Sequence, residues 1–398
     1  FILCTVRISN AFRRGTPAAA IVLGLLTVSI LAGCASGGGS DVRGSLGKAE
    51  GNLNLIAWPG LVENGSTEAD VNWVGPFQDR TGCKVNVKTA TSSDQMLDLI
   101  NKKAYDGVSA PGELAGSLMA DKRVEPINAR LIDNYRGLIP ALRNKPWNSQ
   151  AGKSYGVPQG RSLALLGWRS DAVNPAPSSL MPLFDPASAY RGNVMMHDDP
   201  LSLAVTALAL KASEPDLGIN NPFALTKDQF GAVIDLARNA ESTTSLYWTD
   251  YTEQVRAIEA KSATVGLMTQ SVADLIQARG TKLGTALPAE GTIGSSDTWM
   301  LLKGAKHPSC MYRWMNHVLD PKTNAAMSEY YGQAPAVSAA CNFTQDPGFC
   351  RTYHATDEEF YRNVWFATTP QKRCIGAPGK SCVGFTDWER AWQQLREG

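Results

Sequence analysis

Short apolar runs alternate with amphipathic segments along most of this 398-residue chain. The run LNLIAW at 53–58 and the alternating KVNVKT at 84–89 are strand patterns. Between them, Thr67 and Asp70 have the spacing of a capping box, so a helix is expected from Thr67 to a stop at Gly82. Strands separated by such helices predict parallel sheets covered by helices on both faces, which is an α/β fold.

The first 34 residues have the pattern of an export signal. Arg13 and Arg14 precede a charge-free apolar stretch at 17–32, shorter than the roughly 20 residues of a membrane-spanning helix. The stretch leads into LAGC at 31–34, which matches the bacterial lipobox. That match predicts cleavage before Cys34, lipidation of its sulfur, and an exported protein anchored to the outer face of the cytoplasmic membrane. The alternatives are an uncleaved signal anchor and a buried apolar helix.

A glycine- and serine-rich segment, ASGGGSDVRGSLGKAEG, follows at 35–51. This composition cannot bury a core, and it predicts a flexible linker that spans on the order of 20 Å. The folded part beyond the linker has roughly 345 residues, more than the usual prior of about 100 to 200 for one domain. Two lobes are therefore expected.

The charge balance indicates that nucleic acid is not a partner. The chain has 38 basic and 37 acidic residues, and loss of residues 1–33 would remove three arginines and no acid, leaving 35 basic against 37 acidic residues. No basic run and no acidic tail is present. Nucleic-acid recognition needs a concentrated basic surface, so the sequence favours another kind of partner.

The sequence lacks the motifs on which an exported enzyme would depend. It contains no GxSxG pentapeptide for a serine nucleophile, no phosphate-binding glycine loop, and no histidines in metal-ligand spacing. His197, Asp198 and Asp199 are interpreted as a polar turn, and Tyr330 and Tyr331 as packing residues, rather than as metal sites. We therefore predict that the protein is not an enzyme and holds no metal or cofactor.

Six cysteines remain once Cys4 and Cys34 are set aside with the signal and the lipid anchor. An even number in an exported protein predicts disulfides, although a zinc site is the alternative. Two pairs each bracket a short loop with glycine and proline, which favours local bridges, and the remaining two would form a long-range bridge. The expected pairs are Cys341 with Cys350, Cys374 with Cys382, and Cys83 with Cys310.

Several stretches, in this order, resemble the periplasmic-type substrate-binding proteins of ABC importers, on the spermidine/putrescine-binding branch. The resemblance covers nearly all of residues 52–398. It implies two α/β lobes of the type II binding-protein fold, each a mainly parallel sheet flanked by helices, with a hinge that the chain crosses twice and a ligand cleft between the lobes. The stretches are LNLIAWPGLVENGS, VGPFQDRTGCKVNVKTATSSDQMLDLI, YDGVSAPGELAGSLMADKRVEPIN, KHPSCMYRWMNHVLDPK and TDWERAWQQL.

The resemblance also implies lobe boundaries and partners. Lobe 1 is expected at 52–162, with 296–338 returning to it, and lobe 2 at 163–295, with 339–398 packing on it. The expected partners are a small-molecule ligand, permease subunits of an ABC transporter, and the membrane through the lipid anchor. The protein is expected to be a monomer.

The expected ligand site follows from the chemistry of polyamines. Such a ligand presents ammonium groups on a methylene chain, so carboxylates hold its ends and aromatic faces its middle. Position by position, the resemblance implies an aromatic contact at Trp58 and amine-binding acids at Glu113, at Asp198 or Asp199, and at Asp297.

Other positions depart from the family pattern. Arg161 occupies the first hinge crossing in place of an aromatic motif, Thr269 and Ser295 stand at tryptophan positions, and Gln333 stands at a tyrosine position. An arginine in the cleft would repel a polycation and favour a ligand that carries a carboxylate or phosphonate. The other interpretations are that Arg161 points out to solvent or that a neighbouring acid neutralises it.

The sequence therefore predicts an exported receptor that binds a polyamine and delivers it to a permease. One alternative is a receptor for a zwitterionic or anionic solute such as an amino acid, carboxylate or phosphonate. The other is an exported enzyme or adhesion module on the same fold.

Overall fold

The computed structural model describes residues 42–375 and 379–397. The export signal and Cys34 lie outside these ranges, so cleavage and lipidation stay predictions. Within the described ranges, no helix combines the length and the apolar character needed to cross a membrane.

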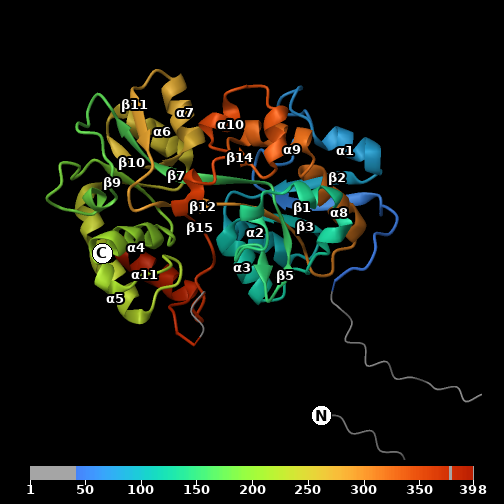
Figure 1. Cartoon of the computed structure of the whole chain (residues 1–398), viewed down its shortest axis with the longest axis horizontal. Helices are drawn as coiled ribbons and strands as arrows, with labels where there is room; N and C mark the ends of the chain where they lie inside the picture. The colour runs from blue at the N-terminus through green and yellow to red at the C-terminus, as the bar shows by residue number, and fades with distance from the viewer. Residues whose placement is uncertain (1–41, 376–378, 398) are drawn as a thin grey trace, which may run out of the picture. The chain divides into compact units, whose positions relative to one another are not determined.

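Five strands form the first sheet, in the order β2-β1-β3-β13-β6. Figure 1 labels the first three of them, β2, β1 and β3. The first three strands pair in parallel, as the alternation of strand and helix patterns predicts. β13 joins from much later in the chain and pairs antiparallel with β3 and β6. The strands are β1 (Asn52–Ala57), β2 (Lys84–Thr89), β3 (Gly107–Ala110), β6 (Gly156–Pro158) and β13 (Thr298–Leu301).

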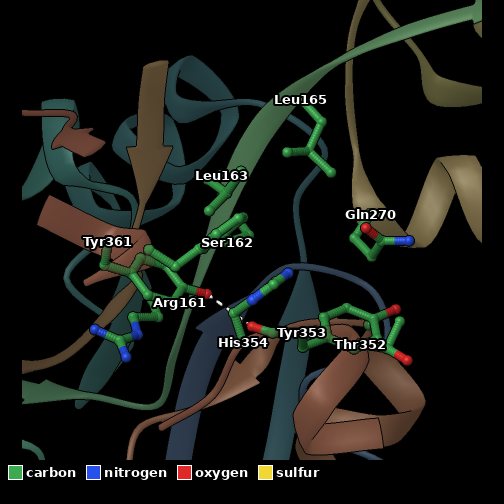
Figure 2. A pocket seen from close by; sticks show the side chains of 11 residues that line it. Arg161, Ser162, Leu163, Leu165, Gln270, Thr352, Tyr353, His354 and Tyr361 are labelled. Atoms are coloured by element: carbon green, nitrogen blue, oxygen red, sulfur yellow. Dashed lines mark hydrogen bonds between the residues drawn. The ribbon is translucent and has the colours of Figure 1, made fainter. Parts of the chain in front are cut away.

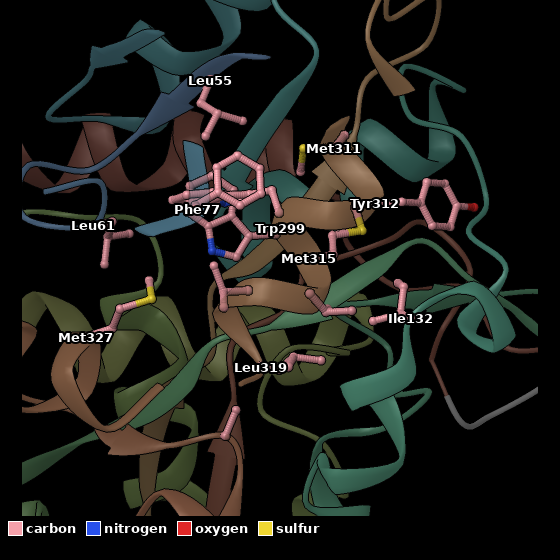
Figure 3. Packing of buried hydrophobic residues seen from close by; sticks show 14 of the residues in the cluster. Leu55, Leu61, Phe77, Ile132, Trp299, Met311, Tyr312, Met315, Leu319 and Met327 are labelled. Carbon is pink, nitrogen blue, oxygen red and sulfur yellow. The ribbon is translucent and has the colours of Figure 1, made fainter. Parts of the chain in front are cut away.

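Helices cover both faces of the first sheet. Adjacent residues of β1 point to opposite faces, so Leu55 packs in the cluster of Figure 3 and Ile56 packs in a second cluster. In the first cluster the ring of Trp314 lies edge-on to Phe77 and Trp299, at centroid distances of 5.1 and 5.5 Å. The helices of this lobe are α1 (Val74–Thr81), α2 (Ser93–Asn101), α3 (Gly112–Ala120), α8 (Pro308–Val318) and α9 (Pro321–Tyr331).

The second sheet is built around β7, in the order β15-β12-β7-β10-β8-β9. β7 pairs antiparallel with β12 and β10, whereas β10, β8 and β9 pair in parallel. β11 and β14 also pair with β7. The strands are β7 (Gly160–Arg169), β8 (Val194–His197), β9 (Thr244–Trp248), β10 (Val265–Thr269), β11 (Leu283–Ala286), β12 (Thr292–Ser295), β14 (Ala334–Pro335) and β15 (Val364–Phe366).

The helices of the second lobe pack around this sheet. α4 is buried along most of its length, which explains why LSLAVTALALKA has no polar face. α5 packs on α4, and α11 packs on α5 with a buried face that includes Trp388 and Trp392. The helices are α4 (Ser202–Ser213), α5 (Lys227–Thr243), α6 (Tyr251–Ala260), α7 (Gln270–Ala278), α10 (Phe349–Thr352) and α11 (Phe385–Glu397).

Two neighbouring strand-to-strand segments form the hinge between the two sheets, and the chain returns to the second sheet once more after α9, where it runs into β14 and later β15. One passage runs from β6 through Gln159 into β7, and the other runs from β12 through Ser296 and Asp297 into β13. β14 lies beside the first passage, because Ala334 pairs with Arg161. The predicted two-lobed α/β fold with a hinge crossed twice is confirmed.

The N-terminal boundary of α1 differs from the prediction. The helix begins at Val74 rather than near Thr67, so the capping-box interpretation is wrong. The side chain of Asn72 accepts a hydrogen bond from the Gly75 amide at 2.8 Å, and Asn64 pairs with Asn72 in an isolated β-bridge. These contacts hold the preceding residues in a turn instead of a helix. The predicted stop at Gly82 is confirmed, with φ of 69°.

The described part of the predicted linker is not a free coil. Leu46 packs against the first core cluster, and the Glu50 carboxylate accepts hydrogen bonds from the Ser309 and Cys310 amides, each at 2.9 Å. These amides belong to the first turn of α8, where a carboxylate is favoured by the helix dipole. The flexible-linker prediction for 35–51 is therefore wrong for its last residues.

All three predicted disulfides are present. The structure pairs Cys83 with Cys310, Cys341 with Cys350, and Cys374 with Cys382. The first joins the beginning of β2 to α8, and the other two close short loops in the C-terminal part of the chain. The zinc alternative is excluded for these six sulfurs, because each is in a disulfide.

Candidate ligand-binding site

A cavity of about 1320 Å³ lies between side chains of the two lobes. It is larger than the roughly 300–1,000 Å³ of typical ligand pockets, so it leaves room for the lobes to approach each other around a ligand. The lining comes mainly from strand ends and the turns that follow them. It includes Trp58, Glu113, Asp297 and Tyr331 on one side, and Ser162, His197, Asp199, Trp248, Thr269 and Ser295 on the other.

The fold explains why these residues meet. Trp58 follows β1 directly, Glu113 lies on the helix that follows β3, and Asp199 follows β8. Trp248 and Thr269 end β9 and β10. The carboxyl ends of parallel strands lie at one edge of a sheet, and ligands of open α/β sheets bind outside that edge. The two sheets thus turn their carboxyl edges toward the same space.

The described lining of the cavity is strongly acidic. It has seven carboxylates, and Lys372 is its one lysine or arginine side chain. Such a lining creates a negative potential that attracts cations and repels anions. The acids are Asp94, Glu113, Asp121, Asp198, Asp199, Asp297 and Glu389.

Two of these carboxyls lack a positively charged neighbour. Burial raises the pKa of Asp297 to about 7, and no described group donates a hydrogen bond to its carboxylate. Burial, followed by the charge of Asp199, raises the pKa of Glu113 to about 7, although the Ser93 hydroxyl donates to it at 2.9 Å. Both side chains keep some contact with the water of the cavity, but protein surrounds them on most sides. The site therefore holds negative charge that has no counter-charge.

The contacts of Asp198 and Asp199 indicate which of the two is free to bind an amine. Asp198 accepts hydrogen bonds from the Trp392 indole at 2.9 Å and from Arg396 at 3.1 Å, so α11 already supplies its counter-charge. Asp199 caps the turn before α4 by accepting from the Leu201 amide at 2.7 Å. Asp199 also lines the cavity, and its charge contributes to the raised pKa of Glu113.

Aromatic side chains form the walls between the acids. The rings of His197 and Trp248 stack at a centroid distance of 4.1 Å. The surrounding protein lowers the pKa of His197 by desolvation, and the charges of Asp199 and Asp198 act against this shift. Tyr331 lines the cavity at the end of α9, where burial and the charge of Asp297 raise its pKa above the usual range. The sequence interpretation of Tyr331 as a packing residue missed this position. Tyr251, close to Trp248 in the sequence, is exposed and lies outside the lining.

The sequence model of the bacterial extracellular solute-binding proteins matches residues 72–349. The chain belongs to this family. This is a family of binding proteins and not a class of enzymes, and its members bind small molecules and work with ABC transporter permeases.

Known relatives of this solute-binding protein share its fold at low sequence identity. A protein of Pseudomonas aeruginosa named as a putrescine/cadaverine-binding protein is 21% identical over 282 residues, which are 67% of this chain and 76% of the relative. The spermidine/putrescine transporter substrate-binding protein of Streptococcus pneumoniae has a TM-score of 0.69 at 14% identity, covering 87% of this chain and 98% of its own. A binding protein of A. tumefaciens in complex with glucopine has a TM-score of 0.64 at 14% identity, covering 87% and 99%.

Arg161 of the solute-binding protein does not line the large cavity. Its guanidinium is fully buried and lies 3.5 Å from the centre of the Tyr361 ring (Figure 2). It donates to Glu358 at 2.8 Å and to the Ala355 carbonyl at 3.0 Å. The prediction that Arg161 lies in the ligand cleft is therefore wrong. The interpretation that a neighbouring acid neutralises Arg161 agrees with the structure. The small pocket of Figure 2, on which Arg161 borders, has about 20 Å³ of space, enough for a water molecule.

The other three residues that depart from the family pattern lie in two places, the cavity and the hinge. Gln333 is buried against Gly160 and does not line the cavity. Thr269 and Ser295 do line it, and Ser295 shares a hydrogen bond of 2.9 Å with Ser162. Small polar side chains at these positions leave space that larger aromatic rings would fill.

Proposed function

We propose that this solute-binding protein captures a small organic polycation, a polyamine of the putrescine or spermidine type, and delivers it to the permease of an ABC transporter. The observation that carries this ligand class is the pair of carboxyls without counter-charge, Glu113 and Asp297, in an acidic cavity. An ammonium group beside them would supply the missing positive charge through charge-assisted hydrogen bonds. Among the described side chains, no group of three acids, histidines or cysteines is arranged to hold a metal ion.

A polyamine also fits the aromatic walls. Its methylene chain would lie against Trp58 and Tyr331, and its second ammonium would face Asp199 and the stacked rings of His197 and Trp248. These residues come from both lobes, so the ligand makes all of its contacts only when the lobes are close together. Binding would therefore shift the population toward a closed form.

The names of the relatives support this ligand class. The Pseudomonas aeruginosa relative is named for putrescine and cadaverine, and the Streptococcus pneumoniae structure for spermidine and putrescine. The same fold holds glucopine in A. tumefaciens, so the fold alone does not choose the ligand. A zwitterionic or anionic solute, such as an amino acid, carboxylate or phosphonate, is the second candidate, favoured by Lys372 in the lining.

Lipidation at Cys34 would hold this receptor beside its permease. Two acyl chains give stable anchoring, and tethering raises the effective concentration of the receptor at the membrane. We assign lobe 1 to 52–162 and 296–338, and lobe 2 to 163–295 and 339–398. The receptor would act as a monomer, because one chain supplies both sides of the cavity.

A thermal-shift screen tests the ligand class. We expect putrescine, cadaverine and spermidine to raise the melting temperature of the purified protein, because a ligand at 100 times its Kd adds about 2.7 kcal/mol to the free energy of unfolding. Amino acids, dicarboxylates and phosphonates at the same concentration serve as matched controls. A shift with anions alone would refute the polyamine assignment and favour the second candidate.

The affinity for putrescine should fall as the pH decreases below 7. Glu113 and Asp297 have pKa values of about 7, so they become protonated in this range and lose attraction for a cation. Alkyl amines titrate near about 10.4, so the ligand keeps its charge. If one carboxyl must ionise, the affinity decreases about 30-fold between pH 8 and pH 5.5. Calorimetry at a series of pH values measures this, and an affinity independent of pH would count against these two acids.

A further inference from the structure

The two lobes touch each other at a place other than the hinge strands. Residues 366–370, here called the strap, leave the end of β15 in the second sheet and pack against α3 of the first lobe. The Ala367 amide donates to the Gly294 carbonyl at 2.8 Å, which holds the strap to β12. On the other side, the ring of Phe366 lies 4.9 Å from that of Trp147, which belongs to the core of the first lobe.

Two glycines of α3 make this contact possible. Gly112 and Gly116 are four residues apart and therefore lie on one face of the helix. A Cβ at Gly112 would overlap the Ala367 carbonyl oxygen, and a Cβ at Gly116 would overlap the Thr369 hydroxyl and lie 2.9 Å from its Cβ. The strap thus lies directly on the helix backbone.

The strap ends next to an acid of the ligand site. The Thr369 hydroxyl donates to the backbone carbonyl of Glu113, between the two glycines in sequence. Thr369 is only 4% exposed, yet it borders the cavity, as do Pro370 and the Glu113 side chain. The strap therefore contacts both the backbone of Glu113 and the space that the ligand would occupy.

We propose that the strap positions Glu113 for the ligand, by docking on the glycine face of α3 and bonding the Glu113 carbonyl through Thr369. The inference rests on the cavity being the ligand site. Thr369 is a positioning residue, because it acts through the orientation and the partial burial of Glu113. The strap is fixed to β12 of the second lobe, so a segment of the second lobe orients Glu113 of the first lobe. The affinity for the ligand therefore depends on how the two lobes are arranged.

The surroundings of Glu113 make its titration a direct sensor of the strap. The Ser93 hydroxyl of α2 donates to Glu113, and the charges of Asp199 before α4 and Asp297 between β12 and β13 act on it. The other charged side chains of the same cavity include Asp94 of α2, Lys372 beyond the strap and Glu389 of α11. Burial is the first cause of its raised pKa. Water that enters beside an undocked strap should therefore lower the pKa of Glu113 toward its usual value.

Gly116→Ala tests the docking, and Thr369→Ala tests the hydroxyl without adding volume. We expect putrescine affinity to decrease about 10- to 100-fold for Gly116→Ala and about three- to tenfold for Thr369→Ala. Thr369→Ser keeps the hydroxyl and should bind like wild type. The matched control is Gly231→Ala on α5, where an added Cβ meets open space, and it should leave the affinity unchanged.

Carboxyl NMR of the ligand-free protein, with the Glu113 signal assigned through Glu113→Gln, separates this inference from the choice of ligand. The Glu113 pKa should decrease in Gly116→Ala and Thr369→Ala and stay as in wild type in Thr369→Ser. If wild type fails to bind putrescine, the ligand class is wrong, and the titration alone decides on the strap. If Gly116→Ala does not fold, Thr369→Ala gives the decision. The role of the strap would be overturned if the folded variants bound putrescine with the affinity of the wild type and their Glu113 had the pKa of the wild type.

Discussion

Asp297→Asn is expected to weaken putrescine binding by at least about 100-fold, because it removes a buried carboxylate that has no partner other than the ligand. Asparagine keeps the shape and a hydrogen-bond acceptor, so the loss reports the charge. The same substitution at Asp198 should cost much less, since Arg396 already neutralises that carboxylate.

The Asp297 substitution should also stabilise the ligand-free protein at pH 8. Burial raises the pKa of Asp297 from its usual 3.8 to about 7, so the folded state binds the proton more tightly than the unfolded state. The stability from this preference is present below about pH 4 and is lost as the pH rises through 7. An asparagine side chain does not ionise, so we expect Asp297→Asn to gain about 1–3 kcal/mol at pH 8 and little at pH 4.

Urea unfolding at both pH values and calorimetry with putrescine measure the two effects of Asp297→Asn. Asp79→Asn is the matched control, because Asp79 is exposed on α1 and lies outside the cavity lining. It should change neither quantity. If Asp297→Asn bound putrescine with the affinity of the wild type, the Asp297 carboxylate would not be part of the ligand site, whatever the effect of the substitution on stability.

Loss of the Cys83–Cys310 disulfide is expected to lower the free energy of unfolding by about 5 kcal/mol. The bridge joins residues 227 positions apart, and in the chain-entropy account a cross-link stabilises more when it closes a longer loop. Both side chains are fully buried, so the double variant Cys83→Ala/Cys310→Ala removes the bridge without adding a polar group to the core. Equilibrium unfolding in urea measures the loss.

The double variant Cys374→Ala/Cys382→Ala provides the comparison for the long-range bridge. Its cysteines are only eight positions apart, so the expected loss is about 2–3 kcal/mol. Equal losses in the two variants would show that loop length does not set the stabilisation.

Local patterns explain what could be predicted from the sequence. The strand LNLIAW, the stop at Gly82 and the short cysteine loops each depend on neighbouring residues, and all three are present in the structure. The resemblance to binding proteins added the order of the lobes and the hinge. It also pointed to Trp58, Glu113 and Asp297, which the fold brings to one cavity.

What could not be predicted depends on partners far away in sequence. Arg161 is neutralised by Glu358, which is 197 residues later, and Glu50 is held by amides about 260 residues later. No periodicity or motif connects such positions. The contact of the strap with α3 and the position of Tyr331 were missed for a related reason, because irregular segments and helix ends give no pattern that shows which side chain faces a cavity.

Isothermal titration of putrescine into the wild-type protein at pH 8 is the most direct measurement of the central claim. We predict saturable binding at one site with a Kd on the order of 1 μM or tighter, lost in Asp297→Asn. The absence of binding by putrescine and spermidine, together with saturable binding of a carboxylate or phosphonate, would contradict the assignment of this cavity to a polycation.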